Sequence, residues 1–197
     1  GDKLSIEVKS EVSCCGSMKD DIWKPCPHHI LGRKKCEMCR NRESNFIFTA
    51  FDGFNTDNYT PEDLAQIQGP HVVYLALFDK KTIKVGVSKL DRKELRQIEQ
   101  GSHFTLYIAQ TSDGIKARQI ETLIRKTGLA DKILLKAKKE LIFPEITEEE
   151  GREILINELN TRQNCLDKYP TLKTCLLTNP EFVNWENIYH FPNFYKN

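Results

Sequence analysis

The chain has 197 residues, and its 29 Lys and Arg residues against 28 Asp and Glu residues give a net charge of +1. A charge so close to zero excludes a protein that coats nucleic acid by bulk positive charge, although a local basic patch is compatible with it. No apolar run approaches the roughly 18 residues that span a bilayer, and the first residues carry no apolar signal-peptide segment. We therefore expect a soluble, cytoplasmic protein with no membrane partner.

The first predicted element is a strand over residues 4–8, where apolar and polar residues alternate. A cysteine-rich segment follows it. The chain contains seven cysteines, an odd number, and four of them lie near two histidines and each other. In a reducing compartment such a pattern favours metal binding over disulfides.

A metal site is predicted where Cys26 and His29 form a C-x2-H pair and Cys36 and Cys39 form a C-x2-C pair. Each short pair folds back so that both ligands face one point, and two pairs complete the tetrahedron that Zn(II) prefers. With four protein ligands the zinc is structural, and it supports a segment whose apolar content is too low for a core of its own. Packed thiols without a metal are the alternative.

The fourth ligand stays open at this point. His28 gives a cramped C-x1-H pair with Cys26, so His29 is preferred. Cys14 or Cys15 is the alternative fourth ligand.

Two further elements are predicted before the main domain. Residues 46–51 are β-prone, which predicts a strand. Thr60 followed by Pro61 and two acidic residues predicts an N-capped helix that extends through Gln68 and stops at Gly69. Residues 1–69 are thus expected to form an N-terminal strand and zinc module.

The main domain is predicted over residues 70–128 as a β-β-α-β-α unit. Its predicted elements are, in order, strands over 72–78 and 82–87, a helix over 92–100, a strand over 103–111 and a helix after the 112–114 cap. In the first helix Leu95 and Ile98 are expected to face inward. The fold class is therefore α+β.

Residues 129–197 are predicted to form a helical extension with an aromatic tail. A basic helix is expected over 129–141 and a second helix, which begins with three acidic residues, over 147–160. The lysines of the basic helix are either a solvated face or a phosphate-binding patch. The tail over 182–195 is too aromatic to remain unpacked, so we expect it to pack across the domain or to bind a partner protein.

The core motifs resemble those of known families. Tyr74, the run from Lys84 to Gly86, Arg96 and Glu121 have the order and spacing of the GIY-YIG nuclease superfamily. A closer resemblance is to domain of unknown function 2797, in which a K-V-G run, an Arg-x3-Q-G run and an Ala-x3-Glu helix follow a cysteine-rich zinc segment. This resemblance covers residues 22–127.

The resemblance implies a GIY-YIG-like small mixed sheet flanked by helices, preceded by a zinc ribbon or knuckle and followed by a helical C-terminal extension. In the superfamily, residues equivalent to Tyr74, Arg96 and Glu121 activate water, stabilise phosphate charge and hold a divalent metal such as Mg(II) or Mn(II). The second catalytic tyrosine is replaced by Lys84, and Gln100 stands where the nucleases often have Tyr or His. A lysine needs its pKa lowered by several units to act as a base. We therefore expect the phosphate-facing groove of this GIY-YIG-like fold to hold nucleic acid without cleaving it.

The expected function is that of a zinc-containing protein that binds structured RNA or a ribonucleoprotein such as the ribosome, with DNA as a further candidate ligand. The residues expected to contact nucleic acid are Lys84, Arg92, Arg96, Gln100, His103, Lys132, Lys136 and Lys139. One alternative is a divalent-metal-dependent endonuclease with Tyr74, Arg96 and Glu121 as catalytic residues. Another is a protein-binding scaffold that uses the aromatic tail.

Overall fold

The chain divides into two compact units. The N-terminal unit comprises Gly1–Phe51 and Asp57–Gln66, and the sheet unit comprises Asp52–Thr56 and Ile67–Asn197. Within them, the computed structural model describes residues 11–19, 22–32, 34–41, 47, 51–130, 133 and 146–186. The strand predicted over residues 4–8 lies outside this part of the chain, as do Lys132, Lys136, Lys139 and the tail beyond residue 186.

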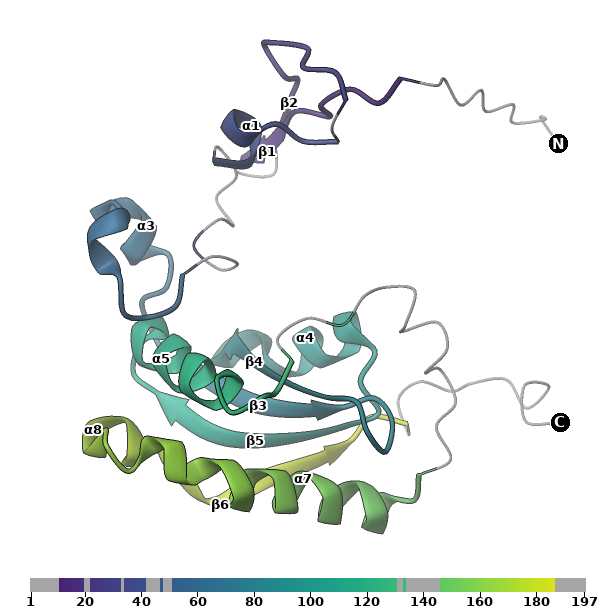
Figure 1. Cartoon of the computed structure of the whole chain (residues 1–197), viewed down its shortest axis with the longest axis vertical. Helices are drawn as coiled ribbons and strands as arrows, with labels where there is room; N and C mark the ends of the chain where they lie inside the picture. Colours follow the sequence, from purple (N-terminus) through teal and green to yellow (C-terminus); the bar gives the residue numbers. More distant parts are fainter. Residues whose placement is uncertain are drawn as a thin grey trace, which may run out of the picture. The chain divides into compact units, whose positions relative to one another are not determined.

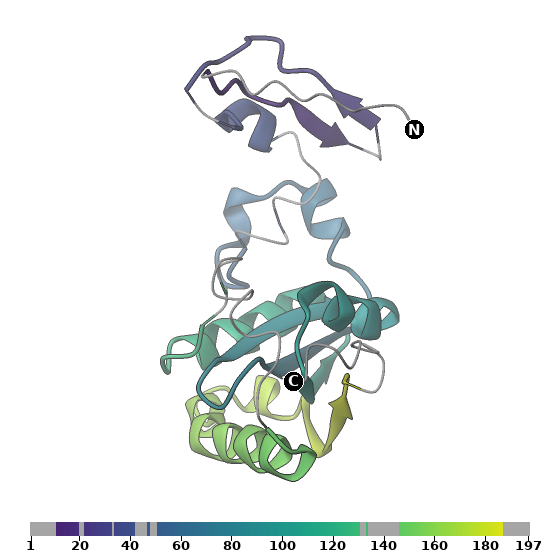
Figure 2. The ribbon, with the colours of Figure 1, turned by 90° about the vertical axis from the view of Figure 1, so that its right-hand side faces the viewer.

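The N-terminal unit contains short elements only. Strands β1 (Ser17–Lys19) and β2 (Ile22–Lys24) form an antiparallel pair in which Met18 lies opposite Trp23 (Figure 2). Helix α1 (Glu37–Asn41) follows a loop (Figure 1). Elements this short cannot bury enough apolar surface for a stable core, so the unit needs another source of stability.

Helix α3 (Pro61–Ala65) begins where the sequence predicts. The Thr60 side chain accepts a hydrogen bond from the backbone N–H of Asp63 at 3.2 Å, and the Asp63 carboxylate accepts one from the backbone N–H of Thr60 at 3.1 Å. This capping box satisfies two backbone donors of the first turn. The helix ends at Ala65, three residues before the predicted end, and the turn η1 (Thr56–Asn58) precedes it.

The strand predicted over residues 46–51 is wrong for the residues that the structure describes there. Ile47 is helical, and the backbone N–H of Phe51 donates to its carbonyl at 3.3 Å. A bond between residues four apart belongs to a helical turn. At Ile47 the β propensity of the side chain therefore does not decide the local structure, as is common for β propensities.

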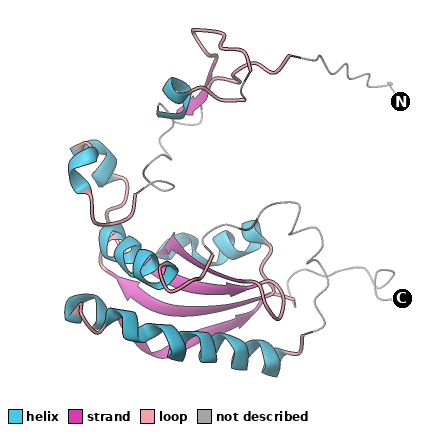
Figure 3. Cartoon of the chain, in the orientation of Figure 1, coloured by secondary structure: helices cyan, strands magenta, loops and turns pink. Residues whose placement is uncertain are grey.

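The sheet unit has the predicted β-β-α-β-α order, followed by further helices and a strand (Figures 1 and 3). Its elements are β3 (His71–Leu77), β4 (Ile83–Lys89), η2 (Leu90–Arg92), α4 (Lys93–Gln100), β5 (Phe104–Thr111), α5 (Gly114–Arg125), α7 (Glu148–Arg162), η3 (Gln163–Leu166), α8 (Pro170–Lys173) and β6 (Leu176–Asn184). The strands form one antiparallel sheet in the order β4-β3-β5-β6. A parallel bridge joins Lys84 to Ala130, so the start of the predicted 129–141 helix is extended instead. Ile133 is not helical either, and the other residues of that prediction lie outside the described part of the chain.

The central strand β3 has side chains that are buried on both faces of the sheet. Val73, Leu75 and Leu77 lie on one face and belong to a core that also contains Ile120 of α5 and Leu155 of α7. Tyr74 and its alternate neighbours lie on the opposite face, on the side of α4. Burial on both faces explains why the sequence of β3 is almost continuously apolar.

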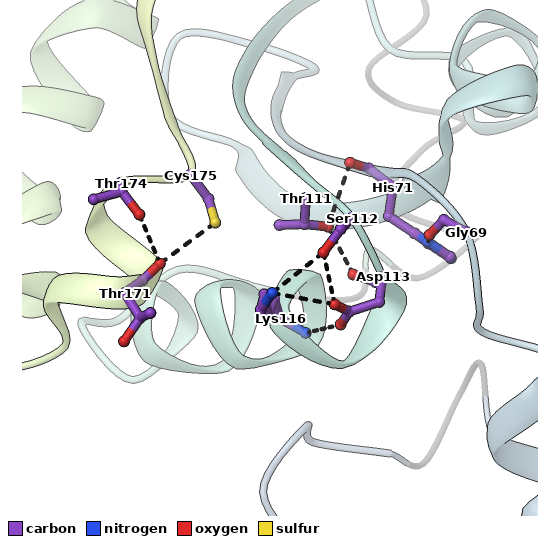
Figure 4. Close-up of polar contacts among 9 residues, drawn as sticks. All are labelled: Gly69, His71, Thr111, Ser112, Asp113, Lys116, Thr171, Thr174 and Cys175. Carbon is purple, nitrogen blue, oxygen red and sulfur yellow. Dashed lines mark hydrogen bonds and ion pairs between the residues drawn. The ribbon is translucent and has the colours of Figure 1, made fainter.

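Helix α5 begins at the cap that the sequence predicts (Figure 4). The Asp113 carboxylate accepts a hydrogen bond from the backbone N–H of Lys116 at 2.9 Å, and the Lys116 ammonium lies 3.5 Å from the same carboxylate. Thr111 Oγ1 donates to the Asp113 carbonyl at 2.7 Å. These contacts fix the end of β5 to the start of the helix and so set the position of Glu121, two turns further on.

The predicted inward face of α4 is wrong. Leu95 and Ile98 are 50 % and 41 % exposed, whereas Gln97 and Gln100 are buried. The reason lies in the sheet beneath, because that face presents hydroxyl groups, among them those of Tyr74 and Thr105, which hydrogen-bond the two glutamines. Satisfying these buried polar groups outweighs the hydrophobic periodicity of an eight-residue helix.

The start of the aromatic tail is a strand, which the sequence did not indicate. Strand β6 pairs with β5, and Trp185 directly after it is 1 % exposed and donates its indole N–H to Thr105 Oγ1 at 2.9 Å. Up to residue 186 the tail therefore packs across the domain, one of the two predicted outcomes. None of the described helices combines the length and the apolar character that crossing a membrane requires.

Candidate functional site

Four buried cysteines of the N-terminal unit form a cluster that could hold a metal ion such as zinc. The sulfur atoms of Cys14, Cys26, Cys36 and Cys39 all lie within 4.8 Å of one another, and no other group of three or more His, Cys, Asp or Glu ligands is found among the described residues. The Cys26 and Cys36 sulfurs are 3.9 Å apart. Thiolates about 2.3 Å from a shared tetrahedral ion would be separated by about 3.8 Å.

Backbone pairing brings Cys14 to this cluster from a distant part of the sequence. The N–H of Cys14 donates to the Ile30 carbonyl at 2.8 Å, and the N–H of Cys15 donates to the Lys34 carbonyl at 2.9 Å. The segment before β1 therefore runs beside the loop that leads to Cys36. Within the C-x2-C pair, the N–H of Cys39 donates to the Cys36 sulfur at 3.4 Å, as in a tight turn.

Amide donors around the cluster favour thiolates. Backbone N–H groups of Ile30 and His28 lower the pKa of Cys26 to about 6, and the N–H of Cys36, 3.2 Å from the Cys14 sulfur, lowers the pKa of Cys14. Burial raises the pKa of Cys39 to about 12. A bound cation would offset that burial, because a thiolate is the form that ligates metal.

The structure brings together three of the four predicted ligands and replaces the fourth. His29 is exposed and has a positive φ of 44°, and neither it nor His28, also exposed, belongs to the cluster. Cys14, one of the two alternatives that the sequence left open, takes the fourth place, and the other alternative, Cys15, is exposed. The preference for His29 rested on spacing along the chain, which cannot reveal a pairing between segments 16 residues apart.

A second polar cluster surrounds Tyr74 in the sheet unit. The Gln100 side-chain amide donates to the Tyr74 hydroxyl at 2.5 Å, and its carbonyl oxygen accepts from the Lys84 ammonium. Tyr74 lies opposite Gly86 in the β3–β4 pairing, and a Cβ at Gly86 would lie 2.4 Å from the Tyr74 hydroxyl oxygen. The Tyr74 ring therefore lies directly over Gly86. Any larger residue at position 86 would occupy the space that the ring fills.

Two charged residues act on the Tyr74 hydroxyl. Burial raises the pKa of Tyr74, the positive charge of Arg96 lowers it, and the negative charge of Glu121 raises it. Glu121 is itself 8 % exposed, and its carboxylate accepts a hydrogen bond from Arg118 at 2.5 Å. Of the residues singled out by the superfamily motifs, Gln100 thus contacts the buried phenol, Lys84 reaches it through Gln100, and Arg96 and Glu121 act on its pKa through their charges.

The remaining predicted contacts for nucleic acid are placed differently. Arg92 and Arg96 lie one turn apart and both pair with Glu99, at 2.8 and 3.6 Å. His103 is 3 % exposed, and its Nδ1 lies 3.2 Å from the Glu186 carboxylate, so its ring belongs to the interior.

A buried polar layer beneath α4 was not predicted. The Gln97 side-chain oxygen accepts hydrogen bonds from Ser102 at 3.3 Å and from Thr105 at 3.2 Å, and Thr105 in turn accepts from Trp185. The Tyr107 hydroxyl donates to the Lys93 carbonyl at 2.9 Å. Gln, Ser and Thr are usually surface residues, so their sequence pattern carried no signal for this layer.

The fold and the two clusters define an α+β protein with an N-terminal four-cysteine module and an antiparallel sheet whose one face carries a buried tyrosine cluster. The family described as "Protein of unknown function (DUF2797)" matches residues 1–183. The chain belongs to this family, as its sequence motifs predicted. It matches no curated protein and no solved structure.

Proposed function

We propose that the four-cysteine cluster binds structural Zn(II) and that the sheet unit binds nucleic acid, structured RNA or a ribonucleoprotein in particular, without cleaving it. The observation that carries this proposal is the convergence of Lys84 and Arg96 on the Tyr74–Gln100 pair. Four buried thiol ligands within 4.8 Å of one another favour zinc over hard cations such as Mg(II), which prefer oxygen.

The polar groups around Tyr74 suit phosphate recognition. Gln100 holds the Lys84 ammonium in one place, and the Arg96 side chain, which acts on the same phenol, is 46 % exposed. Arg92, the N-cap residue of α4, is 55 % exposed and pairs with the same Glu99 as Arg96 does. The fixed Lys84 ammonium beside two exposed arginines, which share Glu99 as a partner, can neutralise phosphates in a chain whose overall charge is almost zero.

Three features favour holding over cleavage. By the resemblance to the GIY-YIG nucleases, Lys84 stands in place of a second tyrosine, and burial keeps Tyr74 protonated by raising its pKa. The Glu121 carboxylate, which would hold the catalytic metal, hydrogen-bonds the Arg118 guanidinium. A neutral phenol is a poor general base, and a carboxylate that is already paired with a guanidinium is a poor ligand for a catalytic metal.

We expect Lys84→Ala and Arg96→Ala each to weaken binding of an RNA hairpin and to reduce the slope of log K against log salt concentration by about 1, because each removes one phosphate contact. The measurement is a titration of the zinc-loaded chain at several KCl concentrations. Lys173→Ala is the matched control, because Lys173 of α8 pairs with Asp167 and has no contact with the Tyr74 cluster among the hydrogen bonds and ion pairs of the described residues, so the slope should be unchanged. If the parent chain shows no salt-sensitive binding to RNA, DNA or ribosomes, the proposal is wrong.

The same preparation tests cleavage. Incubation of hairpin RNA and duplex DNA with Mg(II) or Mn(II) should leave both intact. Cleavage by the parent chain that Glu121→Gln abolishes would instead establish a metal-dependent endonuclease.

A further inference from the structure

The cysteine module, by which we mean the described residues between 11 and 41, exposes a tryptophan. Trp23 is 58 % exposed, and Met18, opposite it in the β1–β2 pairing and so on the same face, is 48 % exposed. A module this small has few apolar residues for its own core. Exposed tryptophan side chains are concentrated at binding surfaces.

The indole of Trp23 is held in a fixed orientation. Its Nε1–H donates to the Cys15 carbonyl at 2.7 Å, and the Cys15 N–H donates to the Lys34 carbonyl at 2.9 Å. Cys15 directly follows Cys14 of the cluster. The ring is therefore anchored by backbone that the metal site orders, which makes it a rigid platform with little conformational entropy to lose on binding.

Positive charge accompanies this platform. From Ile22 to Asn41 the one acidic residue is Glu37, against the basic residues Lys24, Arg33, Lys34, Lys35 and Arg40. Lys24, Lys34 and Arg40 are exposed, and Lys34 is the residue whose carbonyl bonds Cys15. The acidic pair Asp20 and Asp21 lies outside the described residues. An exposed aromatic ring in a module whose charged residues among the described 22–41 are mainly basic fits a polyanion with flat aromatic groups.

We propose that the Trp23 face of the cysteine module is a stacking platform for unpaired bases of single-stranded nucleic acid, with exposed cations of the same module contacting the phosphates. The proposal rests on the proposed function in two respects, namely that the ligand is a nucleic acid and that a metal bound to the cysteine cluster orders the backbone beside Trp23. The bases of a duplex are stacked on each other and do not offer their faces to a protruding ring, so the ligand is a single strand or a loop. It is a site distinct from the one around Tyr74.

Tryptophan fluorescence of the zinc-loaded full chain tests this inference with a ten-nucleotide unstructured oligonucleotide as the probe. The chain has two tryptophans, and Trp185 is 1 % exposed, so quenching reports mainly on Trp23. Trp23→Leu should weaken binding about tenfold or more, whereas Trp23→Phe, which keeps a stacking ring, should stay closer to the parent; both are followed by fluorescence anisotropy of a dye-labelled oligonucleotide. Ile156→Ala, which removes a 40 % exposed apolar side chain from α7, is the control for loss of surface apolarity.

Zinc content, measured for every variant, separates loss of stacking from loss of folding. The inference is overturned if a zinc-loaded Trp23→Leu chain binds the oligonucleotide as tightly as the parent chain. It is also overturned if the parent chain does not bind the oligonucleotide. If hairpin binding in the same samples still depends on Lys84, the proposed function survives that failure. Trp23-dependent binding of the oligonucleotide without any hairpin binding would support the stacking platform and contradict the proposed nucleic-acid site around Tyr74.

Discussion

Replacing Cys14 by serine is expected to lower the Zn(II) affinity of the chain by several orders of magnitude and to unfold the cysteine module. Cys14 is the fourth member of a buried cluster in which each sulfur lies within 4.8 Å of the others, and a serine hydroxyl does not ionise to replace a thiolate. Structural zinc sites have apparent binding free energies of about 10–16 kcal/mol at pH 7, and in small modules this is folding free energy. Competition with a chromogenic chelator measures the affinity, and Trp23 emission reports on the fold of the module.

Two neighbouring substitutions are the matched controls. Cys15→Ser alters an exposed thiol next to the cluster, and His29→Ala removes the ligand that spacing alone favours. Both should bind one zinc with nearly the affinity of the parent chain. The opposite pattern, in which His29→Ala loses the metal and Cys14→Ser keeps it, would show that the cluster of four cysteines is not the site.

The N-terminal unit shows where prediction from sequence stops. Cys26, Cys36 and Cys39 could be found because their ligand spacing is local and has a geometric reason. Cys14 joins them through backbone pairing with Ile30, a contact between distant segments that no local pattern encodes. Short-range spacing thus predicts the kind of site, and tertiary pairing completes the ligand set.

The sheet unit shows a second limit. Its strands and helix caps were predictable because alternation and capping residues act locally, as at Asp113. The orientation of α4 was not, because the outcome depends on which groups the sheet presents beneath it. Leu95 and Ile98 face outward so that Gln97 and Gln100 can satisfy buried hydroxyls. The same inversion places Gln100 between Tyr74 and Lys84 and so creates the cluster on which the proposed function depends.

Gly86→Ala is expected to lower the free energy of unfolding by about 1–3 kcal/mol and to weaken binding of hairpin RNA. The added Cβ would lie 2.4 Å from the Tyr74 hydroxyl oxygen and 2.5 Å from its ring carbon Cζ, so the buried ring must move. A displaced ring breaks the chain of hydrogen bonds from Tyr74 through Gln100 to Lys84. Urea unfolding measures the stability, and the hairpin titration measures the affinity.

A double-mutant cycle shows whether the ring is the cause. Tyr74→Ala removes the ring and is strongly destabilising by itself, but it opens the space above residue 86, so adding Gly86→Ala should then cost almost nothing. We expect a coupling free energy of about 1–3 kcal/mol between the two sites. Leu155→Ala, which opens a cavity on the opposite face of the sheet, should combine additively with Gly86→Ala. Additivity in both cycles would mean that the glycine of the K-V-G run serves some purpose other than admitting Tyr74, and the fixed position of Lys84 would need a different explanation.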